Sequence, residues 1–199
     1  MNPRIRAIVD RVEGPTVLDL GAVQHDANAA ASENWLHDHL VRRFERVIGV
    51  DILAEDIQRL NGQGYEMVQA DVETMELGVT ADTVVAGELI EHLSNPGRML
   101  DRAREHLADD GRLVLSTPNP WAFVHLRRHL HNGLQVNSEH TAWFGPTVLR
   151  QLVDRHGFDV VDRAGVAPSR GGLSLTRAVE RLGFEPFGYT TWVITAEKQ

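Results

Sequence analysis

The sequence predicts an α/β fold with seven strands in a mostly parallel sheet and helices between the strands. Short apolar runs of strand length alternate with segments of helical periodicity along almost the whole chain. The runs at 17–21, 46–51 and 67–71 each carry an aspartate near the carboxyl end, and a fourth run at 83–87 leads directly into the polar motif ELIEH. Apolar runs of this length are typical of buried parallel strands.

The carboxyl ends of parallel strands meet at one edge of a sheet, and open α/β sheets bind their ligands there. We therefore expect Asp19, Asp51 and Asp71 to gather at one ligand site. A row of carboxylates suits a ligand with hydroxyls, amines or positive charge, such as a nucleoside that carries a cation. Taken alone, Asp19 or Asp51 could equally cap a helix, so it is their order along successive strand ends that favours a ligand site.

The length and composition indicate one globular domain, residues 1–199, with a substantial core. The chain has no cysteine, which excludes disulfides, thiolate metal sites and cysteine nucleophiles. No apolar stretch approaches the ~20 residues of a membrane span and no signal peptide is recognisable, so we expect a soluble cytoplasmic protein. The formal net charge of −8 argues against a nucleic-acid partner, because phosphate contacts dominate that kind of binding.

Turn residues and apolar stripes divide the first half of the chain into its elements. The prediction, in order, is a helix at about 3–12, a strand ending at Gly21, a polar loop to 31, a helix beginning near Ser32, a strand ending at Asp51, a short helix with Ile57 and Leu60 inward, and strands at 67–71 and 83–87. The polar segments between the strands are long enough for the crossovers that a parallel sheet requires.

The second half begins with a helix that Asn95 and Pro96 open. The prediction continues with a turn at Asp110-Gly111, a strand at 112–116, a break at Pro118 and Pro120, a helix at 146–156, a strand at 158–166, a helix within 169–184 and a last strand at 189–196. Residues 121–144, rich in Trp, His and Asn, fit no strand. We expect them to form a helical excursion that covers the ligand edge of the sheet.

A dinucleotide-binding fold is the first alternative for such a chain. That fold needs a G-x-G-x-x-G turn after the first strand and an acidic residue about 20 positions later. Here the turn reads GAVQHD from Gly21 and holds one glycine, and Asp51 lies thirty positions further on. Because a pyrophosphate needs the second glycine for its close approach to the backbone, the sequence argues against a dinucleotide site.

The chain resembles class I S-adenosylmethionine-dependent methyltransferases over nearly its whole length. The VLDLG run at 17–21 is similar to the family's first motif, and acids follow at the ends of the next two strands. The resemblance implies a Rossmann-like seven-stranded sheet, mostly parallel, with helices on both faces and the last strand antiparallel. It also implies S-adenosylmethionine as the cofactor.

The resemblance assigns cofactor roles to particular residues. Gly21 would let the backbone approach the methionine moiety, Asp19 would lie near its ammonium group, and Asp51 would accept hydrogen bonds from both ribose hydroxyls. The remaining cofactor residues that it implies are Ile52 beside Asp51, Asp71 at the adenine amino group, Val72 against the ring, and Ala86 with its backbone near the sulfonium. The family usually has G-x-G-x-G where this chain keeps only Gly21, so the path of residues 22–31 stays open.

Glu88, Glu91 and His92 stand at i, i+3 and i+4, so on a helical turn they would share one face beside the transferable methyl. They could simply be polar residues at a helix amino terminus. Alternatively, two carboxylates and an imidazole suit a divalent metal such as Mg, Mn, Fe or Zn, with His140 as a fourth ligand. Without a metal, His92 is the candidate general base, with Glu88 beside it.

A similar E-x-x-E-H turn with a later histidine occurs in small-RNA 2′-O-methyltransferases and some quinone-pathway O-methyltransferases. The motif TPNP at 117–120 and the segment NWLH at 34–37 instead resemble methyltransferases associated with glycan assembly. The sequence thus predicts O-methylation of a small polar acceptor, either a quinone precursor or a sugar or uronic acid. RNA 2′-O-methylation, and a non-catalytic partner subunit that keeps the fold, are the alternatives. The oligomeric state is not predicted.

Overall fold

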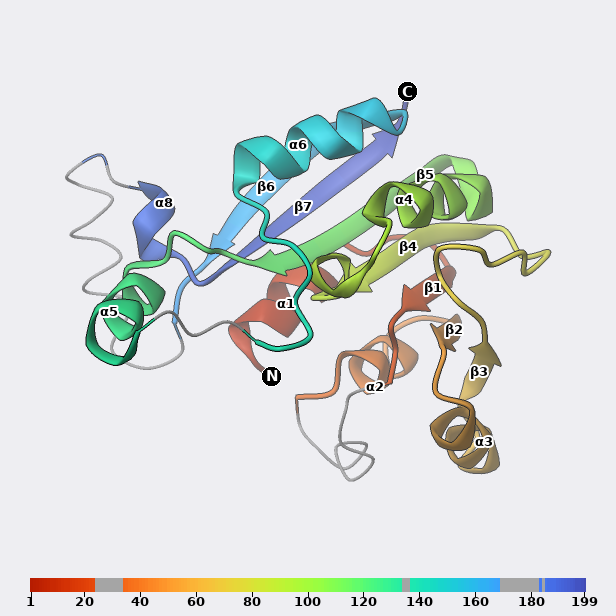
Figure 1. Ribbon diagram of the computed structural model, residues 1–199. Coiled ribbons are helices and arrows are strands. Elements are labelled where there is room, and N and C mark those ends of the chain that lie inside the picture. The colour runs from red at the N-terminus through yellow and green to blue at the C-terminus, as the bar shows by residue number, and fades with distance from the viewer. Residues whose placement is uncertain (24–33, 134–136, 169–182, 184) are drawn as a thin grey trace.

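The computed structural model describes residues 1–23, 34–133, 137–168, 183 and 185–199. Its centre is a seven-stranded sheet in the order β3-β2-β1-β4-β5-β7-β6 (Figure 1). Strands β1 to β5 pair in parallel, whereas β7 runs antiparallel to both of its neighbours. The predicted fold class, including the antiparallel last strand, is confirmed.

The strands lie close to the ranges predicted from the apolar runs. They are β1 (Thr16–Leu20), β2 (Arg46–Asp51), β3 (Glu66–Gln69), β4 (Ala81–Gly87), β5 (Leu107–Pro118), β6 (Phe158–Val166) and β7 (Thr191–Lys198). The helices are α1 (Pro3–Val9), α2 (Leu36–Val41), α3 (Ala54–Gly62), a 3-10 turn η2 (Ile90–His92), α4 (Pro96–His106), α5 (Phe123–Asn132), α6 (Pro146–Arg155) and α8 (Glu185–Gly188).

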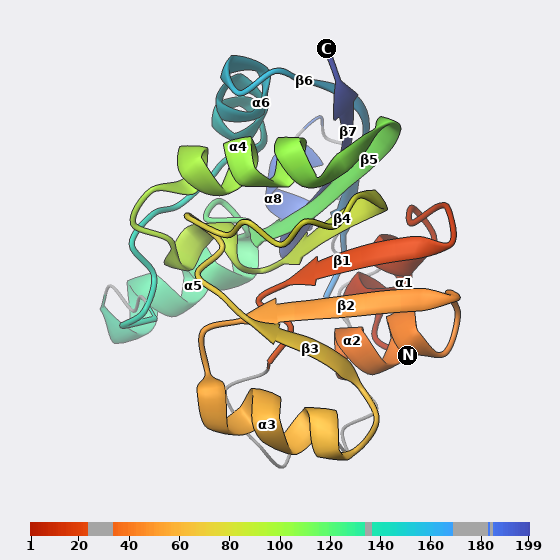
Figure 2. The same cartoon turned by 90° about the vertical axis from the view of Figure 1, so that its right-hand side faces the viewer.

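Helices cover both faces of the sheet because its central parallel strands, β1 and β4, are buried on both sides. Figure 2 shows α1 and α2 on one side and α4 and α6 on the other. Ile8 of α1 packs with Val85, while Met99 of α4 packs with Val84, the neighbouring residue of β4. Because successive strand residues point to opposite faces, this one step along β4 separates the two hydrophobic clusters.

The strand order reverses between β1 and β4, where the connections from their carboxyl ends leave toward opposite halves of the sheet. The β1 end is held by the backbone: the amide N–H groups of Gly21 and Ala22 both donate to the carbonyl of Val50, at 2.8 and 3.2 Å. Gly21 has a positive φ of 69°. The sheet topology thus places Gly21, the last residue of the first motif, at the edge where open α/β sheets bind ligands.

One detail differs from the predicted elements. Ala81 pairs with Leu107 and Thr83 with Arg112, so the predicted turn at Asp110-Gly111 is an irregularity inside a longer strand β5 rather than its start. The helix predicted within 169–184 and most of the loop at 22–31 lie outside the described residues. Within the described ranges, no helix is long and apolar enough to cross a membrane.

Candidate functional site

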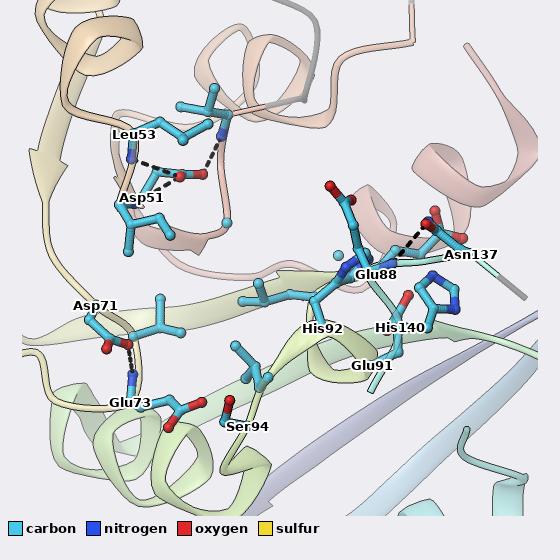
Figure 3. Close-up of a pocket in the computed structure, with 18 of the residues that line it drawn as sticks. Asp51, Leu53, Asp71, Glu73, Glu88, Glu91, His92, Ser94, Asn137 and His140 are labelled. Carbon is cyan, nitrogen blue, oxygen red and sulfur yellow. Dashed lines mark hydrogen bonds between the residues drawn. The ribbon is translucent and has the colours of Figure 1, made fainter. Parts of the chain in front are cut away.

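A cavity of about 820 Å³ lies at the carboxyl edge of β1, β2 and β4. Two groups of polar side chains face it (Figure 3): Asp51, Asp71 and Glu73 on one side, and the segment around Glu88 and His92 on the other. The predicted gathering of strand-end acids therefore occurs, although with one exception described below.

Asp51 ends β2 and is 8% exposed. One carboxylate oxygen accepts the amide N–H groups of Ile52 at 2.8 Å and Leu53 at 3.3 Å, and the other accepts that of Val23 at 2.9 Å. These three bonds hold the carboxylate in one orientation in the lining of the cavity. Because each oxygen has two lone pairs, the oxygen that accepts from Val23 keeps acceptor capacity for a ligand hydroxyl.

Asp71 and Val72 follow β3 and line the same side of the cavity. Asp71 is exposed and its carboxylate accepts the amide N–H of Glu73 at 2.9 Å, while Val72 is buried in the core at 5% exposure. Ile52, at 64% exposure, also lines the cavity. An exposed acid beside apolar side chains offers a hydrogen-bond acceptor next to a surface on which a flat ring can lie.

Glu73 adds a further anion to this side. Burial raises the pKa of the Glu73 carboxyl, but hydrogen bonds from the backbone and side-chain amides of Asn95, at 2.9 and 3.0 Å, outweigh it and hold the pKa below its usual value. Glu73 therefore stays ionised at neutral pH, and this half of the cavity attracts cations or hydrogen-bond donors.

Asp19 points away from the cavity. Its side chain is 2% exposed, and one carboxylate oxygen lies 2.9 Å from Nδ1 of the fully buried His37 on α2. Asp19 is not among the residues that line the cavity, and neither is Ala86, which is fully buried. From the first motif Gly21 lines it, and from the end of β4 Gly87 does.

The chain leaves β4 through Glu88, whose φ of 53° is the only positive value among the described non-glycine residues. Its amide N–H donates to the carbonyl and hydroxyl oxygens of Ser116, at 3.0 and 3.1 Å. The helical turn expected over 88–92 is instead a three-residue 3-10 turn that begins at Ile90. Glu88 consequently does not share a helix face with Glu91 and His92, because its backbone is in the left-handed region.

Glu91 is a buried carboxyl, 1% exposed, at the back of the cavity. One oxygen accepts the hydroxyl of Thr117 at 3.0 Å, and the other has no hydrogen-bond partner. Burial raises the pKa of Glu91 to about 7, with the negative charge of Glu88 acting in the same direction. A carboxyl with such a pKa is protonated in about half of the molecules at neutral pH.

The structure brings His140 to Glu91 and His92, although 48 residues separate it from His92. One possible ligand atom from each of the three lies within 4.8 Å of the others, and the rings of His92 and His140 meet edge-on at 4.7 Å. Thr141 holds the segment there, since its amide and hydroxyl both donate to the carbonyl of Glu91, at 2.8 and 3.1 Å. Glu88 is outside this cluster.

The predicted excursion at 121–144 contributes Asn137, Glu139 and His140 to the cavity lining. Two other residues at the site were not expected there. Arg4 lines the cavity but belongs to no motif, and Thr117, the first residue of the TPNP motif, was not expected to bind Glu91. Their proximity to the site depends on packing between segments far apart in sequence.

The cavity has two sides. One side carries Asp51 and Asp71 next to apolar side chains, and the other, reactive side carries the carboxyl of Glu91 and the imidazoles of His92 and His140. The first suits a nucleoside, and the second suits proton transfer or a cation bound through oxygen and nitrogen atoms. The fold and cavity together suit an α/β protein that binds a nucleoside, which is the class that the first motif predicts.

Comparison with known proteins gives the family. A model of the methyltransferase domain family matches residues 2–163, so the chain belongs to this family. The predicted enzyme class, an S-adenosylmethionine-dependent methyltransferase, is confirmed. An (S)-coclaurine N-methyltransferase from Thalictrum flavum is 27% identical over 103 residues, which is 52% of this chain and 28% of the relative's own length.

Solved structures share the whole fold. A methyltransferase dependent on S-adenosylmethionine from Archaeoglobus fulgidus has a TM-score of 0.72 at 19% identity, covering 98% of this chain and 91% of its own. Magnesium protoporphyrin IX methyltransferase from Synechocystis, solved with bound S-adenosylhomocysteine, has a TM-score of 0.64 at 14% identity, with coverage of 99% and 80%. At such identities the likeness concerns the fold.

Proposed function

We propose that the protein transfers the methyl group of S-adenosylmethionine to an oxygen of a small polar acceptor. The observation that carries this proposal is the cluster of Glu91, His92 and His140 at the reactive side of a cavity whose other side presents Asp51 and Asp71. A volume of about 820 Å³ lies within the range of about 300–1,000 Å³ that is usual for small-molecule sites, which favours a small acceptor over RNA.

The cofactor roles follow from this arrangement. Asp51 accepts the ribose hydroxyls, with Ile52 beside it, and Asp71 accepts from the adenine amino group while Val72 supports the ring. Gly21 and the backbone at Ala86 and Gly87 approach the sulfonium end. Asp19 supports the site from behind through His37, which is a more indirect role than the sequence resemblance implies.

The reaction is an in-line displacement. An acceptor oxygen forms a bond to the methyl carbon, the carbon–sulfur bond breaks, and its electron pair leaves with sulfur as a neutral thioether. The acceptor proton passes to His92, or to Glu91 where that carboxyl is ionised, and Glu88 adds negative charge that stabilises the protonated imidazole. Because the sulfonium is already activated, holding the two reactants in line supplies much of the rate enhancement.

A divalent metal fits the same cluster. Glu91, His92 and His140 offer one carboxylate and two imidazoles, a donor set that suits Mn, Fe or Zn, and Glu91 keeps one buried oxygen without a partner. Ligand atoms about 2.1 Å from an ion lie at most about 4.2 Å apart, so the present 4.8 Å spread requires only a small contraction. When bound, the metal would lower the pKa of a chelated acceptor hydroxyl.

The acceptor classes that suit this chemistry are catechol-like quinone precursors and sugars or uronic acids, because both present neighbouring oxygens. N-methylation is a second candidate, since the curated relative is an N-methyltransferase and the acidic cavity suits an amine. A non-catalytic subunit that binds the cofactor without turnover is the remaining alternative from the sequence.

A methyl-transfer screen tests the proposal. Catechols, sugar nucleotides, uronic acids and primary amines are incubated with labelled S-adenosylmethionine, in Mn²⁺, Mg²⁺, Zn²⁺ or EDTA. We expect turnover of an oxygen acceptor, with His140→Ala about 100-fold slower at unchanged cofactor affinity, and His131→Ala, an exposed histidine on α5, as the matched control. Full turnover in EDTA contradicts the metal, and turnover of amines alone contradicts O-methylation.

A further inference from the structure

The segment at 121–143 carries several large apolar side chains on the protein surface. Twelve large apolar side chains are exposed among the described residues, and five of them lie in this segment: Trp121, Phe123, Leu126, Leu130 and Trp143. Leu130 is 77% exposed and Trp121 60%. A group of exposed apolar side chains, unlike scattered single ones, marks a surface that contacts another molecule.

Helix α5 supplies three of these side chains on one face. Phe123, Leu126 and Leu130 stand at i, i+3 and i+7, so they form an apolar stripe along the helix. Arg127 and His131, which are both exposed, border this stripe on one side. Figure 1 shows α5 at the periphery of the molecule, beyond the carboxyl end of β5. The outer face of α5 is thus an apolar stripe with a basic border.

The start of α5 is anchored to the body of the protein. Asn119 is fully buried, and its side-chain amide donates to the carbonyl of Tyr189 at 2.8 Å while its side-chain oxygen accepts the amide N–H of Trp121 at 3.1 Å. The indole of Trp121 reaches the loop that carries Trp143, since its Nε1 lies 3.1 Å from the place that a Cβ on Gly145 would occupy. The two exposed tryptophans therefore lie on neighbouring segments beside the stripe.

The charge of this part of the chain is opposite to that of the whole. Residues 111–138 include no aspartate or glutamate, although the chain has 28 acids and a formal net charge of −8. The same stretch holds three arginines and three histidines, and all of them except Arg112 lie in α5. An apolar stripe beside positive charge suits a surface that is both apolar and anionic, which a bilayer with acidic lipids presents. A nucleic acid would match the charge but not the exposed leucines.

We propose that α5 and the adjoining tryptophans dock the protein on the surface of a membrane that contains anionic lipids. The apolar stripe enters the boundary between headgroups and acyl chains, the indoles of Trp121 and Trp143 lie at the level of the headgroups, and Arg127 pairs with lipid phosphates. The helix lies in the plane of the surface, because its 10 residues are half of the ~20 that a membrane span requires.

Docking at α5 brings the acceptor side of the cavity to the membrane. Pro118, which precedes α5, and Asn137 and His140, which follow it, all line the cavity. An acceptor that is attached to a lipid, or that partitions into the bilayer, then reaches the reactive side from the membrane surface. This consequence for the acceptor rests on the proposed function, whereas the docking itself does not.

Vesicle sedimentation tests the docking. The protein is mixed with vesicles of phosphatidylcholine alone, or of phosphatidylcholine with about 30% phosphatidylglycerol. Leu130→Asp tests the apolar stripe, and Arg127→Gln tests its basic border. The matched controls are Val161→Asp on β6 and Arg43→Gln after α2, because both side chains are exposed and lie outside the segment at 121–143.

Tryptophan fluorescence gives a second measurement of docking. The chain has four tryptophans, of which Trp35 and Trp192 are buried in the core. A blue shift on addition of vesicles therefore reports the transfer of Trp121 and Trp143 out of water.

We expect wild type to bind the vesicles that contain phosphatidylglycerol with a blue shift, and to bind more weakly to phosphatidylcholine alone or in about 0.5 M NaCl. Leu130→Asp should weaken binding at least about 10-fold, because an acid replaces an apolar side chain that enters the bilayer. Arg127→Gln should weaken it about 5-fold, as for one charge near an anionic surface. Both controls should match wild type.

Equal binding of wild type and Leu130→Asp would overturn the proposal, and so would the absence of binding to both kinds of vesicle. A wild-type dimer that Leu130→Asp dissociates, without vesicle binding, would also overturn it, since the stripe would then contact a second copy of the chain. The assay needs no turnover. Vesicle binding that depends on Leu130 in a protein that methylates no oxygen acceptor therefore supports the docking even as it contradicts the proposed function.

Discussion

The carboxylate of Asp19 lies 2.9 Å from Nδ1 of His37, and both side chains are almost completely buried. This contact joins the first motif on β1 to α2. Asp19 is the acid that the family resemblance places near the cofactor's ammonium group, but here its carboxylate is paired with His37. Asp19 therefore stabilises the edge of the sheet on which the cavity is built.

Replacing Asp19 tests this role. We expect Asp19→Ala to lower the free energy of unfolding by about 1–3 kcal/mol, because it leaves His37 buried without its partner. Urea unfolding measures the change, and a His37→Ala, Asp19→Ala double variant should lose less than the sum of the single losses. A normal stability combined with a large loss of cofactor affinity would instead place Asp19 in direct contact with the ligand.

Replacing Asp51, in contrast to Asp19, should lower cofactor affinity rather than stability. We expect Asp51→Ala to weaken S-adenosylhomocysteine at least about 30-fold, because the charge-assisted hydrogen bonding to the ribose is lost. Calorimetry measures the affinity. The matched control is Asp56→Ala, which removes an acid of α3 that pairs with Arg59 and is not among the cavity-lining residues. Similar affinities for the two variants would contradict the ribose assignment.

The pKa of Glu91 gives a pH-dependent stability. Since burial raises the pKa of this carboxyl from 4.5 to about 7, the folded protein binds more protons than the unfolded chain between these values. The stabilisation that comes from the protonated form is complete below pH 4.5 and is lost as the pH rises through 7, by up to roughly 3 kcal/mol. Glu91→Gln should remove this decline.

Urea unfolding of the metal-free protein between pH 5 and pH 8 measures this effect. The difference in stability between Glu91→Gln and wild type should grow with pH. A constant difference would mean that Glu91 ionises at its ordinary pKa. The comparison is made in EDTA, because a cation at the cluster would favour the ionised carboxylate.

Replacing Gly21 tests the turn of the first motif, and Gly78 is its matched control. Both have a positive φ, 69° and 63°, so Ala is strained at each. A Cβ at Gly21 would also lie 2.8 Å from Leu89 Cδ1, whereas one at Gly78 meets nothing within 4 Å.

We expect Gly78→Ala to cost about 1 kcal/mol of stability. Gly21→Ala should cost more and should weaken S-adenosylhomocysteine, because the displaced Leu89 lines the cavity. Thermal unfolding and calorimetry measure the two effects. Equal stabilities and normal binding in both variants would show that the turn tolerates a side chain.

Periodicity and composition predicted the layers of this fold because strand and helix patterns are local. The apolar runs gave six of the seven strands close to their observed bounds, and the acids at their ends were expected at one sheet edge. The start of β5 was misplaced, since Asp110-Gly111 carries a turn signal that the pairing of Leu107 with Ala81 overrides.

The reactive side of the cavity differs from the arrangement that the sequence predicted. The E-x-x-E-H spacing suggested one helix face, but the backbone turns left-handed at Glu88 and separates it from Glu91 and His92. The structure places His140 beside Glu91 and His92. Arg4 was not expected at the site, because nothing in its sequence neighbourhood marks a helix that packs across the end of β4.

The sequence by itself determined the fold class, the enzyme family and the edge of the sheet that carries the acids, because all three follow from residues close together along the chain. Only the tertiary structure decided that Asp19 turns into the core, that Glu91 is buried with a raised pKa, and that Arg4 meets Glu88 at the cavity. These properties depend on which surfaces pack against each other, and burial and charge pairing arise only from that packing.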